Sequence, residues 1–355
     1  LRAAGQLTEI RAAQLSFDEA EANALLRNTL RLDITPDIVR LLWERTEGWP
    51  AGLYLAGLSI RDRADVTGVM EGLAGDNRNI AEYLAQEILD LQPPRRRNFL
   101  LRTSILDRLT ASLCDVLVGE SGSQGVLRDL ERANLFVIPL DGDRQWFRYH
   151  HLFGDWLRHE LAIREPDVVA DLHLRAARWH LEHGSHPRAI DHALAAGDVA
   201  LAADAIEEFF YLADYGDRAT TSRLAAIPDE ITVARPRLAL ARAVDDIANG
   251  HINDAARWLE AAERLSEDAS GGIAEAELLI AKGTYYRVSG DVGRAASTTR
   301  RAVAAAGEAS AEAYTVALGL FASVSFWESG PAAALSPMRE YVRRITRFGI
   351  SDQSG

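Results

Sequence analysis

The chain has 355 residues, of which 48% are hydrophobic, and its formal net charge at pH 7 is −13. This length allows two or three domains with cores of their own, and the hydrophobic content excludes an intrinsically disordered chain. The acidic balance argues against a general binder of nucleic-acid backbones, because such binding needs a basic surface.

Single residue types exclude several kinds of site. The only cysteine, Cys114, can form neither an internal disulfide nor a zinc site built from cysteines, and it favours a reducing cytoplasm. The only lysine, Lys282, follows no glycine-rich loop, so the chain lacks the P-loop that binds nucleotide phosphates. No stretch has the ~18 uninterrupted apolar residues of a membrane span. We therefore expect no enzymatic activity, no cofactor or metal, and no membrane contact in this chain.

The first part of the chain is predicted to be helical after one short strand at residues 6–11. Ser16 and Glu19 have the spacing of a capping box, which predicts the start of a helix at Ser16. Thr35 and Pro36 predict the start of the next helix, because proline is favoured at the first helical position. The helices predicted after this first one cover residues 36–46, 51–59, 79–91, 94–104, 110–118 and 124–133.

A β-hairpin is predicted where this helical region ends. A hydrophobic run at 135–140 and a second run from Trp146 flank the turn sequence Asp141-Gly142-Asp143. The second run leads directly into an amphipathic helix at 151–161. Helices followed by a hairpin and another helix predict a winged helix. A long helix from Glu165 to about residue 183 follows.

Beyond about residue 184 the sequence repeats. Gly250, Gly290 and Gly330 lie 40 residues apart, and small residues such as Ala255 and Ala295 follow them at a nearly fixed distance. Glycine supplies the left-handed end of one helix, and alanine lets the next helix pack closely against it. This period predicts a solenoid of helical hairpins near the tetratricopeptide range. The earlier pairs with the same spacing are Gly184 with Ala189 and Gly197 with Ala202.

Several stretches in the first 200 residues together resemble the MalT-like branch of the STAND signal-transduction ATPases. Proteins of this branch are bacterial regulators that usually end in a LuxR-type helix-turn-helix. The chain does not begin with methionine, and the resemblance implies that it is an interior part of a longer protein. The matching stretches, in the family order, are Gly5–Arg11, Thr46–Leu53, Phe99–Asp107, Leu130–Phe136 and Tyr149–Phe153.

The resemblance implies a mainly α fold: a helical lid, a winged helix with one β-hairpin, and a tetratricopeptide-like α-solenoid. The Walker motifs and the sensor arginine of the family would precede Leu1, so ATP or ADP would bind only in the full-length protein. The implied domains are the last strand of a nucleotide-binding domain at 1–13, a helical lid at 14–74, the winged helix at 75–163, a helical connector at 164–225 and repeats at 226–355.

The first candidate nucleotide contact is Gly48-Trp49-Pro50. From its position alone, Pro50 is an ordinary first-turn proline of a helix. In the related NB-ARC proteins a glycine-x-proline at this place packs against the adenine and ribose. By that resemblance Gly48 and Pro50 would contact the nucleotide, with Gly48 allowing close approach of the backbone. Most MalT-like chains have alanine in place of this proline. We expect Trp49 to lie in the core.

The second candidate is the histidine pair after the hairpin. Tyr149-His150-His151 resembles the Met-His-Asp motif of NB-ARC winged helices, whose histidine contacts the β-phosphate of ADP. By position, His150 takes that role and His151 stands in place of the aspartate. Without the resemblance, we would expect one ring to be buried and hydrogen-bonded and the other to cap the helix or face solvent.

Two other groups of polar residues are interpreted as solvated surface. The spacing of three between His180 and His183 is compatible with a metal site, but the helix is predicted to end at Gly184 and no carboxylate triad or catalytic signature surrounds it. The basic run Arg95–Arg97 is too short to indicate a nucleic-acid contact. The histidines in question are His180, His183, His186 and His192.

The expected function is that of the regulatory and sensor portion of an ATP-dependent STAND transcriptional regulator. The winged helix would hold ADP in the resting state through His150, and the repeats would receive a small-molecule or protein inducer, because solenoids present a long concave binding surface. Self-association on activation fits this scheme, and direct DNA contact does not. One alternative is the MalT-like regulatory tail of a serine/threonine protein kinase, acting as a protein-interaction scaffold. Another is an enzyme that uses the histidine cluster on a metal.

Overall fold

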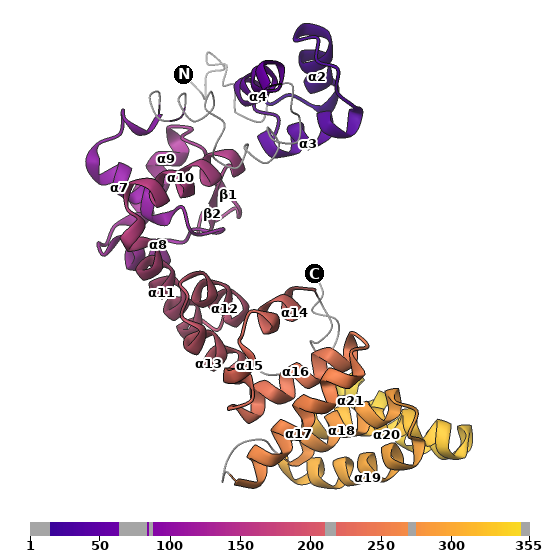
Figure 1. Ribbon diagram of the computed structural model, residues 1–355. Helices are drawn as coiled ribbons and strands as arrows, with labels where there is room; N and C mark the ends of the chain where they lie inside the picture. Colours follow the sequence, from indigo (N-terminus) through magenta and orange to yellow (C-terminus); the bar gives the residue numbers. More distant parts are fainter. Residues whose placement is uncertain (1–14, 64–83, 85–87, 210–217, 269–274, 349–355) are drawn as a thin grey trace. The chain divides into compact units, whose positions relative to one another are not determined.

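A computed structural model describes residues 15–63, 84, 88–209, 218–268 and 275–348 (Figure 1). The described part of the chain is mainly α-helical with a single two-stranded sheet, which confirms the predicted fold class. The chain forms two compact units, Leu1–His183 and Gly184–Gly355. The predicted strand at 6–11 and most of the predicted helix at 79–91 lie outside the described residues. Among the described helices, none is long and apolar enough to cross a membrane.

The first unit opens with the described part of the expected lid. It contains α2 (Glu19–Asn23), which continues into a π-helical segment, η2 (Ala24–Thr29), then α3 (Pro36–Thr46) and α4 (Pro50–Arg63). The start of α3 is as predicted, because the Thr35 hydroxyl accepts a hydrogen bond from the Ile38 amide at 3.5 Å.

The capping box predicted at Ser16 and Glu19 is wrong by two residues. The Asp18 carboxylate accepts from the Glu21 amide at 2.8 Å, and the Glu21 carboxylate accepts from the Asp18 amide at 3.0 Å. Aspartate caps a helix as well as serine does, so the sequence offered two equivalent boxes. The later start places Ala22 in the core.

The rest of the first unit is the winged helix and the helix after it. The two strands pair antiparallel, with Val137 opposite Tyr149 and Pro139 opposite Phe147. Leu109 adds a third segment, since its amide and carbonyl both pair with the backbone of Phe147, at 2.7 and 2.9 Å. The elements are α7 (Pro94–Thr103), α8 (Ala111–Val118), α9 (Ser123–Arg132), β1 (Val137–Pro139), β2 (Phe147–Tyr149), α10 (His151–Arg164) and α11 (Pro166–Glu182).

The hairpin connection differs from the predicted Asp-Gly turn. The residue with positive φ is Arg144, at 53°, and not Gly142. The Asp141 carboxylate accepts hydrogen bonds from the amides of Gln145 and Trp146, at 2.9 and 3.0 Å. This side chain closes a loop longer than two residues, in the way that aspartate commonly stabilises turns.

Buried aromatic side chains fix the hairpin against the helices around it. Phe147 and Phe153 are fully buried, and Tyr149 packs against Phe153 with ring centroids 5.8 Å apart. The Tyr149 and Thr103 hydroxyls share a buried hydrogen bond of 2.7 Å, which ties β2 to α7. The backbone after Tyr149 is therefore held in place, and it carries His150.

The second unit consists of helices that pack as successive antiparallel hairpins: α16 on α17, α18 on α19, and α20 on α21 (Figure 1). Its helices are α12 (His186–Ala195), α13 (Val199–Phe209), α14 (Arg218–Ala225), α15 (Asp229–Thr232), α16 (Pro236–Ala248), α17 (Ile252–Asp268), α18 (Glu275–Val288), α19 (Val292–Ala309), α20 (Ala311–Ser329) and α21 (Pro331–Phe348).

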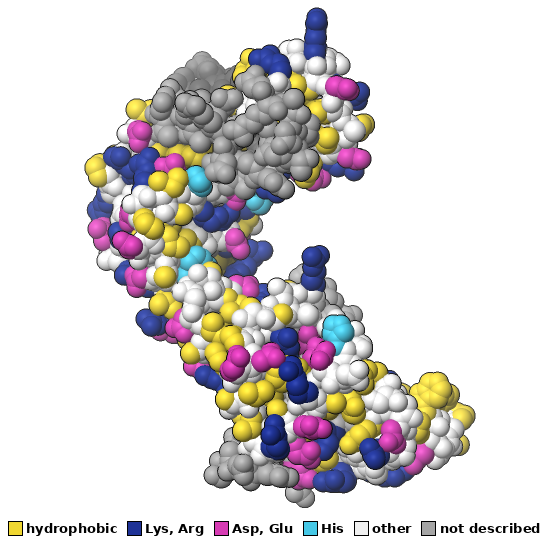
Figure 2. Space-filling view, viewed as in Figure 1, with side chains coloured by type: hydrophobic (Ala, Val, Ile, Leu, Met, Phe, Trp, Pro, Cys, Tyr) yellow, Lys and Arg dark blue, Asp and Glu magenta, His cyan; other side chains and the backbone are white. Residues whose placement is uncertain are grey.

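The repeat prediction is confirmed at each of its three glycines. Gly250, Gly290 and Gly330 follow the first helix of a hairpin with φ of 82°, 81° and 83°. Ala255 and Ala295 are fully buried between the paired helices, where small side chains permit close packing. On the face shown in Figure 2, arginines and acidic side chains are interspersed, unlike the continuous basic surface used to bind nucleic acid.

Candidate functional site

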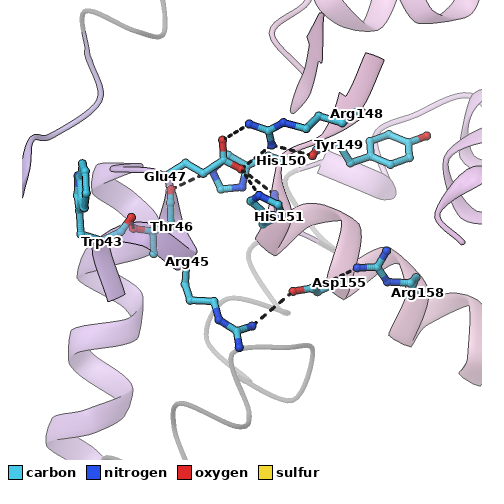
Figure 3. A network of polar contacts seen from close by, with 10 residues as sticks. All are labelled: Trp43, Arg45, Thr46, Glu47, Arg148, Tyr149, His150, His151, Asp155 and Arg158. Carbon is cyan, nitrogen blue, oxygen red and sulfur yellow. Dashed lines mark hydrogen bonds and ion pairs between the residues drawn. The ribbon is translucent and has the colours of Figure 1, made fainter. Parts of the chain in front are cut away.

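The end of α3 meets the junction between the hairpin and α10, and both nucleotide candidates lie near this contact. The close-up in Figure 3 shows Thr46 and Glu47 facing Arg148, His150 and His151. All five belong to the first unit. The contact brings together segments about a hundred residues apart in the chain.

His150 is buried, with 7% of its surface exposed. Its amide donates to the Phe136 carbonyl at 2.8 Å, and its ring Nε2 lies 2.9 Å from the Thr46 carbonyl oxygen. Because a carbonyl can only accept, Nε2 must carry the proton. Nδ1 is buried and has no hydrogen-bond partner in the described part of the chain. As expected for one histidine of the pair, the ring is buried, but only one of its two nitrogens is hydrogen-bonded in the described part of the chain.

The protonation of His150 follows from its surroundings. Burial lowers the pKa of the ring, although the Glu47 carboxylate and the hydrogen bond to Thr46 act in the opposite direction. A ring with a lowered pKa is neutral at pH 7. With its proton on Nε2, the neutral ring presents an acceptor at Nδ1 and no second donor.

Glu47 is the residue at which the polar contacts converge. Its two carboxylate oxygens accept from the two terminal nitrogens of Arg148, at 2.7 and 2.8 Å. One of them also accepts from the backbone amide of His151 at 3.0 Å. Burial by itself would raise the pKa of Glu47, but the hydrogen bonds from Arg148 and the His151 amide outweigh it and lower the pKa to about 2.

His151 stands where the related motif has aspartate, and its side chain is 64% exposed, with Nε2 3.8 Å from the Glu47 carboxylate. A carboxylate nevertheless reaches the first turn of α10, because Glu47 supplies it from the lid. The Glu47 carboxylate thus lies beside the position at which the related motif has aspartate.

Gly48 is required by the chain itself. Its φ is +71°, and a Cβ atom here would lie 2.3 Å from the Phe17 carbonyl oxygen. The Phe17 amide donates to the Gly48 carbonyl at 2.8 Å, and the Trp43 indole donates to the Phe17 carbonyl at 2.8 Å. The close backbone approach predicted for Gly48 exists, and in this structure its partner is Phe17.

The two residues after Gly48 have local roles. Pro50 is the first residue of α4, where its fixed φ and missing N–H fit a helix start. Trp49 was expected in the core; it is half-buried and packs against the core, with its ring centroid 5.0 Å from Phe136 and 6.2 Å from His150. The tryptophan thus places the Gly48–Pro50 turn beside the histidine.

The histidines near Gly184 are not all solvated, contrary to the prediction. His180 is buried at 3% exposure, and its ring lies edge-on to Trp179. The His183 ring stacks on Trp179 at 3.8 Å, and its Nδ1 lies 2.7 Å from the Trp179 carbonyl oxygen. Among the described residues, no group of three or more histidine, cysteine, aspartate or glutamate side chains could hold a metal ion.

Glu47 and Arg148 were both missed as site residues. Glu47 lies inside one of the stretches that carry the family resemblance, directly before Gly48, and Arg148 immediately precedes another, which begins at Tyr149. The one local signal was Glu47 itself, a charged residue between the end of a helix and a glycine. Nothing in either segment indicated that the two would pair.

The sequence matches the family model of the MalT winged helix domain over residues 85–169. The serine/threonine-protein kinase PknK of Mycobacterium tuberculosis is 36% identical over 290 residues, which cover 79% of this chain and 26% of the kinase. The HTH-type transcriptional regulator MalT of Klebsiella pneumoniae is 34% identical over 251 residues, which cover 68% of this chain and 27% of that protein. The chain thus spans about a quarter of the length of these curated relatives.

A solved structure shares the fold. It is a STAND protein with a tetratricopeptide repeat sensor from Pyrococcus horikoshii, with a TM-score of 0.54 and 14% identity. The alignment covers 95% of this chain and 55% of that protein, and so includes both the winged-helix and the repeat regions. The chain therefore carries a MalT-type winged helix domain followed by tetratricopeptide-like repeats, is similar to MalT regulators, and shares its fold with a STAND protein.

Proposed function

We propose that this chain is the regulatory and sensor portion of an ATP-dependent STAND transcriptional regulator of the cytoplasm. The matches to MalT regulators and to a STAND protein with a repeat sensor support this reading. Because the chain spans only about a quarter of its curated relatives, nucleotide binding and transcriptional control belong to the longer protein.

In this proposal the winged helix holds ADP in the resting state, with His150 as its phosphate contact. The observation that supports it most is the buried Nδ1 of His150, which has no partner in the described residues although buried polar atoms are normally hydrogen-bonded. A phosphate oxygen would satisfy this atom once the ring had taken up a second proton. By resemblance, Gly48 and Pro50 would pack against the adenine and ribose.

The repeats of the second unit are proposed to receive a small-molecule or protein inducer, and activation would lead to self-association. Their packing as successive hairpins supports this assignment, because such arrays present extended surfaces to partners. This chain would contribute neither ATP hydrolysis nor DNA contact, since it has no P-loop and carries a net charge of −13.

The test is the affinity for ADP of a protein that joins this chain to the nucleotide-binding domain of its family. His150→Ala should weaken ADP binding at least tenfold, because one charge-assisted hydrogen bond contributes about 1.5–3 kcal/mol. His151→Ala, at the exposed neighbour, is the matched control and should change the affinity little. A folded His150→Ala variant with unaltered ADP affinity would show that His150 has only a structural role.

A second candidate is favoured by the match to PknK: the chain would be the MalT-like regulatory region of a serine/threonine protein kinase. The second unit would then be a protein-interaction scaffold for the kinase. The gene sequence on either side of this chain decides between the two candidates, since one requires a kinase domain and the other a DNA-binding helix-turn-helix.

A further inference from the structure

The lid and the winged helix are joined by polar contacts that converge on two consecutive residues. The Thr46 carbonyl accepts from the His150 ring, and the Glu47 carboxylate binds Arg148 and the His151 amide. Arg45 and Asp155, 4.0 Å apart, add a weaker charge contact between α3 and α10. The end of one lid helix therefore holds the segment that carries the candidate phosphate contact.

The first turn of α10 has no cap of its own. His150 occupies the N-cap position, but its side chain makes no capping hydrogen bond. The amide of His151 is satisfied by Glu47, which lies 104 residues earlier in the chain. A carboxylate at a helix N-terminus is also favoured by the helix dipole. If the lid moved away, α10 would lose its cap and Arg148 would lose its bidentate partner.

The backbone holds Glu47 in this role. Glu47 has φ of +50° and Gly48 has φ of +71°, so two successive residues adopt left-handed conformations after α3. Left-handed backbone is unfavourable for a glutamate, and it persists here because the tertiary contacts compensate for it. This turn directs the carboxylate toward the hairpin, as Figure 3 shows.

We propose that Glu47 is a latch between the lid and the winged helix, a positioning residue that keeps His150 in its buried orientation only while the lid is docked. The assignment of the docked arrangement to the resting, ADP-bound state rests on the proposed function; the latch itself does not. Release of Glu47 would free Arg148, the start of α10 and the His150 ring together, and would thereby release the docked arrangement of the lid and the winged helix.

The test compares Glu47→Gln with Glu44→Gln in this chain. Glu44 is exposed on the last turn of the same helix, so its substitution removes the same charge without touching the contact. In Glu47→Gln the His151 amide should exchange with solvent at least tenfold faster than in the wild type, as measured by residue-resolved hydrogen exchange. In Glu44→Gln its rate should be unchanged. Equal rates in the two variants would overturn the latch.

The titration of His150, followed by NMR, separates a latch from a simple neighbouring charge. Loss of the Glu47 charge alone would lower the pKa of His150 further, because the carboxylate stabilises the protonated ring. Undocking of the lid would instead expose the ring and raise its pKa toward the ordinary value. The latch predicts a rise in Glu47→Gln, and a fall contradicts it.

Arg148→Gln is a second variant that tests the latch even if Glu47→Gln fails to fold. It leaves the carboxylate on the His151 amide, so the exchange of that amide should lie between those of the wild type and Glu47→Gln. An unchanged rate would show that the ion pair contributes nothing to docking. No nucleotide is present in these measurements, so they can fail or succeed independently of the ADP affinity of His150→Ala.

Discussion

Replacing Gly48 with alanine tests whether this glycine is needed by the fold before any nucleotide binds. The added Cβ would lie 2.3 Å from the Phe17 carbonyl oxygen, whereas real Cβ contacts stay beyond 3.0 Å. The Phe17 backbone must therefore move, and it is held there by hydrogen bonds to Gly48 and from Trp43. Gly119 is the matched control in the same unit: its φ is +80°, but its nearest contact is a flexible arginine at 4.0 Å.

Both variants carry the penalty of a left-handed alanine, about 1–2 kcal/mol. Gly48→Ala adds the cost of overpacking against backbone, about 1–3 kcal/mol, and weakens two hydrogen bonds. We therefore expect Gly48→Ala to be less stable than Gly119→Ala by about 2 kcal/mol. For the m-values of ~1–3 kcal/mol/M typical of urea, this lowers the unfolding midpoint by roughly 1 M more than the control does.

Urea unfolding followed by tryptophan fluorescence measures this difference. Five of the seven tryptophans lie in the first unit, so the signal reports mainly on the unit that contains both glycines. Equal midpoints for the two variants would refute the steric argument. If Gly48→Ala lowered only the affinity for ADP and left stability unchanged, Gly48 would instead be needed for nucleotide binding.

Three further outcomes are expected. The pKa of Glu47 is lowered from 4.5 to about 2, so the stability that its ionised form contributes is complete above pH 4.5 and is lost as pH falls toward 2. At 1.36 kcal/mol per pKa unit, reduced for solvent screening, the free energy of unfolding should fall by about 1–2 kcal/mol over this range. Urea titrations at each pH should show this loss in the wild type and not in Glu47→Gln. Ala295→Trp should destabilise the second unit by about 1–3 kcal/mol and leave hydrogen exchange in the winged helix unaltered, because repeats contact only their neighbours. Cys114 is buried and burial raises the pKa of its thiol, so an alkylating reagent at pH 8 should modify it in urea but not in the native protein.

The sequence by itself determined those features that a few neighbouring residues control. The repeat glycines fix left-handed helix ends through their own backbone freedom, and Thr35 with Pro36 starts α3 through a local cap and a fixed φ. The order of helices around one hairpin likewise follows from short-range patterns. Where two local signals competed, as between Ser16 and Asp18, the sequence alone did not decide the outcome.

Only the tertiary structure decided the site. Glu47 meets Arg148 and the His151 amide across 101 and 104 residues of chain. Neither segment contains a pattern that specifies the other, because this pairing depends on where the shared hydrophobic core places α3 and β2. The same core buries His150 and leaves its Nδ1 without a partner among the described residues. Local propensities set the elements of this chain, whereas the contact between the end of α3 and the β2–α10 junction arises from long-range packing that brings these segments together.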